Sequence, residues 1–366
     1  MIPILYLSHC GSSIGGGEKQ LYYLTTNLDR DKYQPIIVCP DDGVFAEKLR
    51  NTKIPTIILH LPSWRKTTSL LSRYRAAAKL TNLTRKHNIQ LVHTSDSWLN
   101  HYLIHIKKHI GIPIISHVRN LLTPMQVSKY GFDLMDRIIS ISHQSKKPFV
   151  KSEVSTPKID VVLNCVDLSK FQPESKKNGK QSDKFVVGLV GRIEPFKRQD
   201  TFVELANLVI QQCQNVTFQI IGAALDTPKH RTFAKQVREL VTKYNLNDSI
   251  HFTGHRDDMP QVMQELDLLV TLSAGSVIAE AMASGLPVIG TYIGSTDEMI
   301  IEGVTGYIFP TDKIDHISAK IVQLAKNPEL CIQMGNAARN HAESTFSIDR
   351  HVQKIQDIYM ELLDRN

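Results

Sequence analysis

The stretch HCGSSIGGGEKQLYYLTTNL, residues 9–28, decides the fold of the first half of the chain. The apolar run IPILYLS precedes it, and leucines at helical spacing follow its glycines. The three consecutive glycines, residues 15–17, indicate either a backbone with positive φ or an approach too close for a Cβ atom. A strand, a glycine-rich loop and a helix in this order direct backbone N–H groups at a phosphate. The stretch therefore predicts a phosphate-binding unit, with a flexible turn as the alternative.

The same alternation of apolar runs and helical patterns continues to the end of the chain. Runs rich in Ile and Val, such as PIIVCP and PIISHV, are typical of buried parallel strands. A polar segment with Gly and Pro, residues 172–183, is the expected interdomain linker. The pattern predicts an α/β protein with two doubly wound, Rossmann-like domains, residues 1–171 and 184–349. The last helix, residues 350–366, has no strand after it.

The composition is that of an ordinary globular enzyme, with 366 residues, 42% hydrophobic and 22% charged. No apolar run reaches the roughly 18 residues of a membrane span. The first residues, MIPILYLSHC, lack a basic leader and predict a strand, not a signal peptide. The five cysteines are far apart, so neither a disulfide framework nor a zinc site is expected and a cytoplasmic location fits.

Positive charge is concentrated in the first half of the chain. Residues 1–170 contain 23 Lys and Arg but 12 Asp and Glu, whereas the remainder contains 20 and 24. This imbalance predicts an anionic surface or ligand facing the first domain. No nucleic-acid-binding module is recognisable and aromatic residues are few, so nucleic acid is not expected as a partner. A membrane with anionic lipids is the better hypothesis.

A second cluster of candidate residues lies in GLVGRIEPFKRQD, residues 188–200. Gly191, Arg192 and Lys197 fall on the loop that leaves the first strand of the second domain. Two cations on one strand-to-helix loop can converge on a diphosphate through charge-assisted hydrogen bonds. The alternative is that both are ordinary surface cations.

A third cluster lies in SAGSVIAEAMASGLPVIGT, residues 273–291. Glu280 stands among good helix formers, where its carboxylate could accept hydrogen bonds from a ribose diol. Gly275, Ser276 and Val277 precede it and would form the loop and first turn of that helix, a second anion site. Glu280 as a plain surface residue is the alternative, although its apolar neighbours favour partial burial.

Seven stretches in register make the chain similar to glycosyltransferase family 4, the retaining GT-B enzymes that use nucleotide-sugar donors. They are GGGEKQLYYL, VVLNCVDLSKF, GLVGRIEPFK, FQIIG, IHFTGHRDDMPQVMQELDLLVTLS, AEAMASGLPVIGT and GVTGYIFPTD. The resemblance implies two Rossmann-like domains facing across a cleft, the first joined by the terminal helix. It also implies transfer of a hexosyl unit to a glycan or lipid-linked acceptor in cell-surface polysaccharide assembly.

The resemblance implies a role for each candidate residue. Arg192 and Lys197 resemble the pair that neutralises the leaving diphosphate, and Glu280 resembles the glutamate that binds the ribose hydroxyls. The other residues implied in donor binding are Gly16 and Gly17 of the first domain, with Arg119, and Gly191, Gly254, His255, Gly275, Ser276 and Val277 of the second. No metal ion and no cofactor is implied, because the two cations supply the charge.

Three positions depart from the family pattern. The first glutamate of the E-x7-E motif falls at Leu272, which puts recognition of the donor sugar, and even turnover, in question. Cys165 stands where glycine is usual in the family. His117 and Arg119 compete for the place of a histidine near the reacting carbon, and His117 is the catalytic candidate.

Retention without a protein nucleophile implies that the acceptor hydroxyl attacks on the face from which the diphosphate leaves. The protein would then contribute positioning and charge stabilisation. Leu272 motivates one alternative, a catalytically silent subunit that binds a sugar nucleotide. A nucleotide-sugar epimerase of the same architecture and, more distantly, a nicotinamide dehydrogenase, suggested by Asp41 and Asp42 after the second apolar run, are the others.

Residues 63–88 suggest how the first domain could meet a membrane. They predict a helix with apolar residues on one side, namely Leu70, Leu71, Tyr74, Ala77 and Ala78. Most of the cations would lie on the other side, namely Arg65, Lys66, Arg73, Arg75, Lys79 and Lys86. The pattern predicts peripheral docking on the inner face of an anionic membrane, and an amphipathic helix with a solvated basic face is the alternative.

Overall fold

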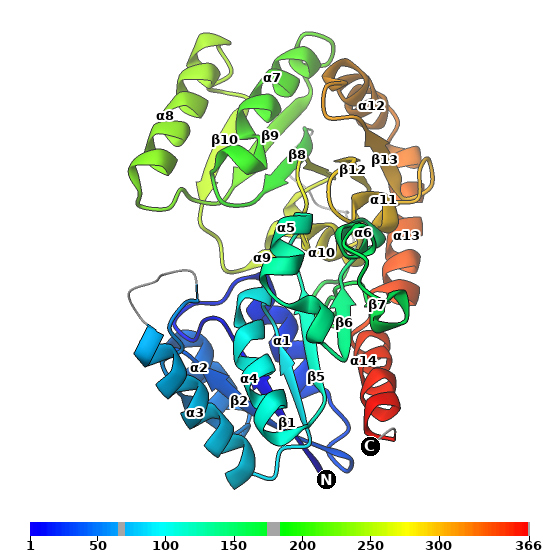
Figure 1. Ribbon diagram of the computed structural model, residues 1–366. Helices are drawn as coiled ribbons and strands as arrows, with labels where there is room; N and C mark the ends of the chain where they lie inside the picture. Colours follow the sequence, from blue (N-terminus) through cyan, green and yellow to red (C-terminus); the bar gives the residue numbers. More distant parts are fainter. Residues whose placement is uncertain (65–69, 174–183, 365–366) are drawn as a thin grey trace. The chain divides into compact units, whose positions relative to one another are not determined.

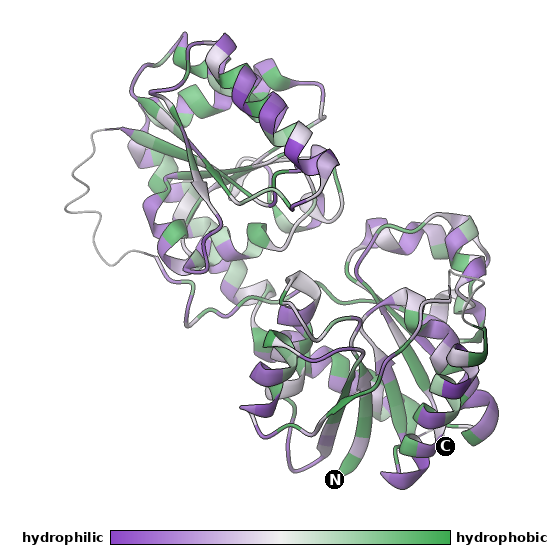
Figure 2. Cartoon of the chain, turned by 90° about the vertical axis from the view of Figure 1, so that its left-hand side faces the viewer, coloured by the Kyte–Doolittle hydropathy of each residue, from purple (hydrophilic) through white to green (hydrophobic). Residues whose placement is uncertain are grey.

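The computed structural model describes residues 1–64, 70–173 and 184–364, and these divide into two compact units (Figure 1). The first unit contains residues 1–165 and 348–366, and the second contains residues 166–347. Each unit is a parallel sheet with helices packed on both of its faces. The apolar strands run through the interior of each unit, and the polar helix faces lie outside (Figure 2).

The sheet of the first unit has the strand order β3-β2-β1-β4-β5-β6-β7, and every pair is parallel. Connections leave β1 toward β2 on one side and β4 on the other, so the topology switches between β1 and β4. The strands are β1 (Ile2–Leu7), β2 (Tyr33–Cys39), β3 (Thr56–Ile58), β4 (Leu91–Thr94), β5 (Ile114–Val118), β6 (Arg137–Ser140) and β7 (Ile159–Val161).

The sheet of the second unit has the order β10-β9-β8-β11-β12-β13, again parallel, and it switches between β8 and β11. The strands are β8 (Phe185–Val190), β9 (Val216–Ile221), β10 (Ile250–Gly254), β11 (Leu268–Thr271), β12 (Val288–Thr291) and β13 (Gly306–Phe309). Within the described residues these two sheets contain thirteen strands, one for each apolar run, which confirms two doubly wound α/β units.

Helices cover both faces of the first sheet. One apolar cluster packs α3, α4, α5 and α6 on one face, and a second packs α1, α2 and α14 on the other. These helices are α1 (Gly16–Thr26), α2 (Val44–Arg50), α3 (Leu70–Lys86), α4 (Asn100–Ile110), α5 (Pro124–Lys129), α6 (His143–Lys151) and α14 (Ile348–Leu363). The second unit contains α7 (Gln199–Ile210), α8 (Pro228–Lys243), α9 (Met259–Glu265), α10 (Val277–Ala283), α11 (Thr296–Met299), α12 (Ile314–Lys326) and α13 (Pro328–Thr345).

The two units meet at Cys165 and Val166, six residues before the end of the first domain that the sequence suggested. Val166 donates its N–H to the carbonyl of Phe346 (2.8 Å), and Arg339 donates to the carbonyl of Phe171 (2.7 Å). These bonds tie residues 166–171 to the end of α13, and therefore to the second unit. Of the linker predicted at 172–183, residues 174–183 lie outside the described residues.

The orientation of α3 differs from the prediction. The helix buries Arg73, Ala76, Ala77 and Leu80, whereas its first-turn apolar residues are exposed. Of the predicted apolar side, Leu70, Leu71, Tyr74 and Ala78 are exposed and only Ala77 is buried, and the predicted outer cation Arg73 is buried. The packed side is the one with Ala76, Ala77 and Leu80, since small alanines allow close packing on α4 and the sheet. The predicted cations Arg65 and Lys66 lie outside the described residues.

The terminal helix α14 packs on the first unit through a buried polar network. Tyr359 hydrogen-bonds with Tyr6 (2.9 Å) and with Nδ1 of His93 (2.6 Å), which joins α14 to β1 and β4. His351 donates from Nδ1 to the carbonyl of Leu163 (2.8 Å), next to the boundary between the units. The helix thus returns to the first unit after the chain has crossed to the second.

Three buried histidine rings stack between the sheet and α14. The ring centroids of His93 and His117 are 5.4 Å apart, and those of His117 and His351 are 6.2 Å apart. Burial is the main cause that lowers their pKa values, to about 3 for His93, to about 4 for His351 and well below 6.5 for His117. All three are therefore neutral at neutral pH.

These histidines predict a loss of stability in mild acid. Unfolded histidine titrates near pH ~6.5, so below that pH the unfolded chain binds protons that the folded chain does not. The free energy of unfolding of the first unit should fall by about 1.4 kcal/mol per pH unit per histidine between pH ~6 and ~4. Denaturant unfolding at several pH values measures this slope.

A matched pair of variants assigns the slope. His351→Gln removes one buried titrating group and should flatten the pH dependence by about one proton. His255→Gln, at a side chain that is 73% exposed, should leave the slope unchanged. Equal slopes in the wild type and His351→Gln would contradict the assignment.

Candidate functional site

The second unit brings its predicted site residues together at the topological switch point. Strands β8 and β11 are neighbours in the sheet, but their following connections run to opposite sides. Such a point leaves a crevice at the carboxyl ends of the strands, where open α/β sheets bind ligands. The loop after β8 carries Gly191, Arg192 and Lys197, and the loop after β11 carries Ala274 and Gly275.

Lys197 connects the two loops. Its ammonium donates to the carbonyl of Ala274 (2.9 Å), and its methylene groups pass beneath Gly191. A Cβ atom on Gly191, whose φ is +152°, would lie 3.1 Å from the Lys197 side chain, and one on Gly275 would lie 3.4 Å from its Nζ. Because neither glycine has a side chain, the backbones of the two loops can lie this close to Lys197.

The environment of Lys197 favours an incoming anion. Burial is the main cause that lowers the pKa of its ammonium; Arg192 adds to that effect and Glu194 opposes it. Among the described residues, no carboxylate forms an ion pair with Lys197. A half-buried ammonium with a neutral carbonyl as its partner gains more from a phosphate than a solvated lysine does.

Arg192 lies on the same loop, but its environment differs from that of Lys197. Its side chain is 61% exposed and its guanidinium is 3.3 Å from one oxygen of Glu194, whose other oxygen is 3.7 Å from His230. An exposed ion pair contributes little to stability, so Arg192 can exchange the carboxylate for a phosphate at small cost. Lys197 is thus held by a hydrogen bond to the backbone, whereas the exposed Arg192 is held only by an ion pair.

Two residues that the sequence analysis missed shape this loop. Gln199 is fully buried, donates its amide to the carbonyl of Arg192 (2.8 Å) and accepts the N–H of Glu194 (3.4 Å). Gly222 lies beneath the loop, where a Cβ atom would come within 2.1 Å of the Gly191 carbonyl oxygen. Gly222 ends the motif FQIIG and could have been singled out, whereas nothing in the sequence distinguishes Gln199.

Glu280 lies in the first turn of α10, half-buried, on the helix that follows the Lys197-contacting loop. The helix has only seven residues, and the side chain of Ser276 before it makes no capping hydrogen bond. Gly275 and Ser276 lie on the loop before α10, and Val277 and Glu280 lie in its first turn. This location is compatible with the predicted contacts to a nucleotide.

Gly254 and His255 lie at the end of β10. Gly254 accepts the N–H of Gly222 (2.8 Å), which connects it to the same group of loops, and a Cβ atom there would meet nothing within 4 Å. His255 is mostly exposed and is 3.1 Å from Asp257. The backbone of Gly254 joins the cluster, and the His255 ring lies on its outer side.

Leu272, the position of the missing family glutamate, does not face the loops. It is 1% exposed and belongs to the apolar core between the second sheet and its helices. The side chain at this position could not reach a sugar on the surface of the cluster. At this position the chain therefore differs from the family motif in two ways. The residue is leucine, and the backbone directs its side chain into the core.

The first unit holds a second cluster around the glycine-rich loop. None of residues 15–17 has a positive φ; Gly15 is extended and the other two form the first turn of α1. Gly15 donates its N–H to Glu18 (2.9 Å), which also lies 3.0 Å from Nδ1 of His9. A Cβ atom on Gly17 would lie 3.7 Å from Arg119. That distance is an ordinary contact, and only at Gly15 would a Cβ atom come closer, to 3.0 Å from the Glu18 carboxylate. Neither positive φ nor a close approach within this unit therefore explains Gly17.

Arg119 follows β5 and points toward this loop. It donates to Asn164 (2.7 Å) and to Nδ1 of His117 (3.4 Å), and burial lowers its pKa to about 10, so it stays charged at neutral pH. His117 has no exposed surface, which is incompatible with direct contact to a substrate in this conformation. Of the two competing residues, Arg119 is the partly exposed one, and His117 is its buried hydrogen-bond partner.

Asp41 holds the glycine-rich loop in place. Its carboxylate accepts the N–H of Gly11 and the hydroxyl of Ser12 (2.8 Å). Asp42 is paired with Arg50. Both carboxylates are engaged within the protein, which weakens the argument for a nicotinamide ribose at this position.

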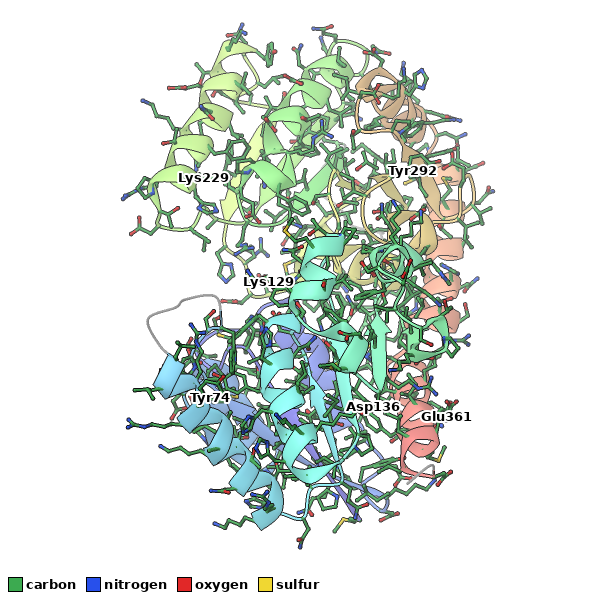
Figure 3. The ribbon with its side chains drawn as sticks, in the orientation of Figure 1. Tyr74, Lys129, Asp136, Lys229, Tyr292 and Glu361 are labelled. Carbon is green, nitrogen blue, oxygen red and sulfur yellow. The ribbon has the colours of Figure 1, made fainter. Side chains whose placement is uncertain are left out.

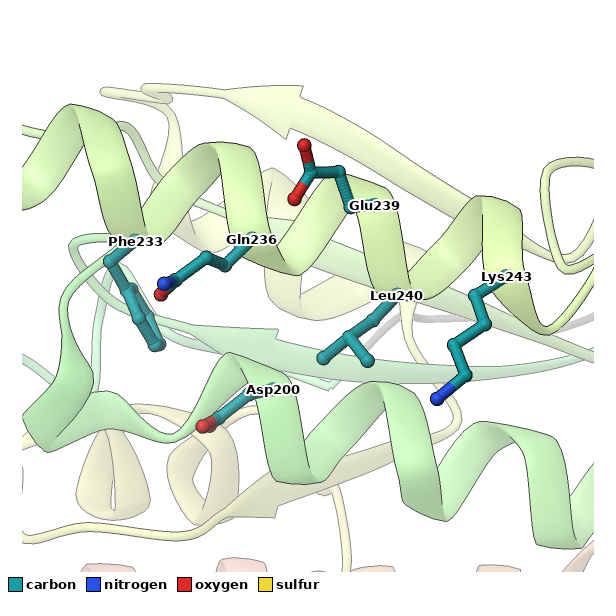
Figure 4. Close-up of a pocket in the computed structure, with 6 residues that line it drawn as sticks. All are labelled: Asp200, Phe233, Gln236, Glu239, Leu240 and Lys243. Carbon is teal, nitrogen blue, oxygen red and sulfur yellow. The ribbon is translucent and has the colours of Figure 1, made fainter.

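The described residues contain neither a cluster of metal ligands nor a helix suited to cross a membrane. No three His, Cys, Asp or Glu side chains among them gather closely enough to ligate a metal ion. In the same part of the chain, no helix combines the length and the apolarity that crossing a bilayer requires. A groove of about 350 Å³ between α7 and α8 is formed by residues outside the predicted site, namely Asp200, Phe233, Gln236, Glu239, Leu240 and Lys243 (Figure 4).

Solved structures share this arrangement over the full chain. Anabaena HepE in complex with UDP superimposes with a TM-score of 0.86 at 21% identity, over 98% of this chain and 100% of that one. A glycosyltransferase from Rickettsia africae superimposes with a TM-score of 0.85 at 19% identity, over 100% and 99%. The fold is that of the GT-B glycosyltransferases, as the resemblance implied.

Family models cover most of the sequence. Residues 14–170 match Glycosyltransferase Family 4, and residues 170–341 match Glycosyl transferases group 1. The chain belongs to glycosyltransferase family 4. A galactosyltransferase of Escherichia coli, UDP-Gal:alpha-D-GlcNAc-diphosphoundecaprenol alpha-1,3-galactosyltransferase, is 24% identical over 366 residues, 92% of this chain and 91% of that protein. The lipopolysaccharide core mannosyltransferase LpsB of Rhizobium meliloti is 28% identical over 249 residues, 64% and 68%.

The burial of Leu272 generates a prediction. Leu272→Glu should lower the free energy of unfolding by about 3 kcal/mol or more, because a carboxylate would lose its water without gaining a partner. It should not raise the transfer rate. Leu272→Met, which keeps the volume, should cost less than about 1.5 kcal/mol. Denaturant unfolding compares them, and a Leu272→Glu variant as stable as the wild type would refute the buried position.

Proposed function

We propose that the protein is a retaining, metal-independent glycosyltransferase. It transfers a sugar from a nucleoside diphosphate to a glycan or lipid-linked acceptor in cell-surface polysaccharide assembly. The observation that carries the proposal is the half-buried Lys197 on the same loop as the exposed Arg192 at the switch point of the second unit. Two cations five residues apart on the loop after β8 match the charge of a diphosphate.

The comparisons support the donor and acceptor classes. HepE was solved with UDP and with UDP-glucose, so this fold accommodates a uridine diphosphate sugar in that protein. The name of the Escherichia coli galactosyltransferase specifies UDP-Gal as donor and a sugar on diphosphoundecaprenol as acceptor. We infer the same classes here, a nucleotide sugar and a glycan that is lipid-linked, with an anionic membrane surface as a further partner.

The roles follow from charge and position. Lys197 and Arg192 neutralise the diphosphate as it leaves, and Glu280 binds the ribose hydroxyls. Gly191, Gly275, Ser276 and Val277 offer backbone groups to the same nucleotide, and Gly254 with His255 faces the base. In the first unit, Gly16, Gly17 and Arg119 form a second group suited to an anion.

The proposed reaction needs no protein nucleophile. The bond between the anomeric carbon and the phosphate oxygen breaks, and the acceptor oxygen bonds to the same face of that carbon. The hydroxyl proton passes to the leaving phosphate, whose basicity grows as it separates. The protein's contribution is charge stabilisation and orientation, each worth several kcal/mol in comparable enzymes. No cofactor and no catalytic metal enters this scheme.

The proposed location is the cytoplasm, with peripheral contact on the inner face of the membrane. All five cysteines are free thiols, three of them buried. Thiols that stay reduced are typical of a cytoplasmic protein.

The division of roles predicts distinct kinetic defects. Arg192→Ala and Lys197→Ala should each lower the rate at saturating donor by about a hundredfold, because charge on the diphosphate grows in the transition state. Glu280→Gln should mainly weaken donor binding, since ribose contacts are alike in the ground and transition states. Nucleotide release in the presence of acceptor measures the rate, and proton NMR of the product establishes its anomeric configuration.

The control is Lys229→Ala, an exposed lysine of the same unit that is labelled in Figure 3. Its kinetics should equal those of the wild type, and a chelator should leave the rate unchanged. If all variants changed only the apparent donor affinity, the roles would be assigned wrongly. An inverted product would refute the retaining reaction, and a product that kept its nucleotide would identify an epimerase.

A further inference from the structure

The carboxylate of Glu194 lies between two groups that can carry positive charge. One of its oxygens is 3.3 Å from the guanidinium of Arg192, and the other is 3.7 Å from Nε2 of His230. Arg192 belongs to the proposed diphosphate site, whereas His230 lies in the first turn of α8 and has no role in that site so far. The side chains of Glu194 and His230 are each only 17% exposed, so water shields their contact weakly.

The backbone of Glu194 is held, while its side chain faces two partners. Its N–H donates to the amide oxygen of Gln199 (3.4 Å), and its carbonyl accepts the N–H of Lys197 (2.9 Å). The carboxylate extends from this anchored backbone, and each of its oxygens faces a different group. Rotation about the side-chain bonds can therefore shorten one contact and lengthen the other without moving the loop.

His230 is placed to hold a carboxylate in either of its protonation states. Its Nδ1 is 2.6 Å from the hydroxyl of Thr227, which also caps α8 by accepting the N–H of His230 (3.4 Å). A hydroxyl can donate to a neutral imidazole and accept from a charged one, so this contact persists when the ring gains a proton. Nε2 is left to face Glu194. Because imidazoles change charge near neutral pH, the strength of this pair can change there too.

The surroundings make Glu194 the partner of the ring. Among the described residues, it is the carboxylate within 4 Å of His230. On the loop after β8 the same carboxylate faces Arg192, and it also acts on the ammonium of Lys197, whose pKa it raises against the larger effect of burial. The remaining charged groups at the starts of α7 and α8 are Asp200, the ion pair of Asp226 and Arg231 (3.1 Å), and the exposed Lys229, which is labelled in Figure 3.

We propose that Glu194 and His230 couple donor binding to the uptake of a proton. Without donor, Glu194 occupies Arg192. When the diphosphate of a nucleotide sugar binds Arg192, Glu194 turns to His230, and the ring takes up a proton from the solvent. We call this pair the Glu194–His230 latch. Both are positioning residues, and the inference rests on the proposed function because it requires a diphosphate at Arg192.

Charge sets the direction of the coupling. A nucleotide sugar brings two negative charges to the loop, so the carboxylate of Glu194 is repelled from Arg192. A neutral imidazole does little for the displaced carboxylate, whereas an imidazolium forms an ion pair with it. Donor binding therefore raises the affinity of His230 for a proton. By reciprocity, a proton on the ring raises the affinity for the donor by the same factor.

The test is calorimetric titration of the full chain with UDP-glucose, the ligand with which HepE was solved. Each phosphate of this probe has one acidic group, which stays ionised at neutral pH, so protons taken up on binding go to the protein. Titrations in buffers of different ionisation enthalpy count these protons. If binding raises the proton affinity of the ring about tenfold, the wild type should take up about half a proton at pH 7. Its affinity should be about sixfold higher at pH 6 than at pH 8.

Three variants separate the latch from a structural ion pair. His230→Gln cannot gain a proton, so uptake should fall below about 0.1 and the affinity should stay near the wild-type value at pH 8. His230→Lys carries a charge throughout this range, so its affinity should be flat at or above the wild-type value at pH 6. Glu194→Gln leaves Arg192 without a competing carboxylate, so it should bind more tightly than the wild type at pH 8, without proton uptake.

Steady-state kinetics provide a second readout. In His230→Gln at pH 6, the KM for the donor should rise about sixfold, while kcat should change by less than about twofold, because the latch acts on binding. A purely structural contact would give neither this division nor the rescue by lysine.

The matched control is His316→Gln, which removes an exposed histidine from α12 of the same unit and should keep the wild-type proton uptake. Thermal unfolding checks that all variants fold. A wild-type affinity that does not change with pH, or proton uptake that persists in His230→Gln, would overturn the latch. So would a wild type that binds UDP-glucose at no pH in this range, or a His230→Lys variant with the pH dependence of the wild type.

The latch and the enzyme assignment can fail separately. Sugar transfer from any donor, without proton uptake that depends on His230, would leave the proposed function standing and remove the latch. Proton-linked binding of UDP-glucose without transfer to any acceptor would support the latch and contradict the enzyme assignment.

Discussion

The hydrogen bond from Lys197 to the carbonyl of Ala274 is the interaction on which the proposed site depends. It joins two loops that leave the sheet in opposite directions, and it holds an ammonium group where the two separate. The close contacts around it require glycine at Gly191 and Gly222, because a Cβ atom on Gly191 would press on the Lys197 side chain and one on Gly222 would displace the loop itself. Gln199 also stabilises this loop through hydrogen bonds to the backbone of Arg192 and Glu194. A charge held this way costs little reorganisation when an anion binds, which is the condition for electrostatic catalysis.

In the first unit, too, hydrogen bonds within the protein hold a loop and a charged side chain in place. Its glycine-rich loop is held by Asp41 and by the contact between Glu18 and the N–H of Gly15, so that the start of α1 stays accessible. Arg119 reaches this loop from β5 and is itself positioned by His117. That histidine belongs to the buried stack closed by α14, so the return of the terminal helix supports a charged residue at the carboxyl edge of the sheet.

Much of the fold could be predicted from the sequence because apolar runs at regular intervals leave few alternatives. The apolar runs predicted the strands of both sheets. Gly191, Arg192 and Lys197 were recognised as a cluster because they share one loop. Gln199 acts through contacts with backbone groups that come close only after folding, so no local pattern indicated it. Asp41 was noted for a nicotinamide ribose, and its contacts with the loop at Gly11 and Ser12 likewise arise only on folding. The side of α3 that packs on the sheet was not apparent from the sequence, because alanines carry a weaker apolar signal than leucines, although they allow closer packing.

The most direct test of the central claim is a comparison of nucleotide affinities by calorimetry, after thermal-shift screening has identified the preferred base. If Lys197 binds the diphosphate, the wild type should bind the nucleoside diphosphate at least about tenfold more tightly than the matching monophosphate. In Lys197→Gln this preference should shrink to less than about threefold, while the monophosphate affinity stays nearly constant. Lys229→Gln should retain the full preference. A Lys197→Gln variant that folds normally and keeps the wild-type preference would contradict the account.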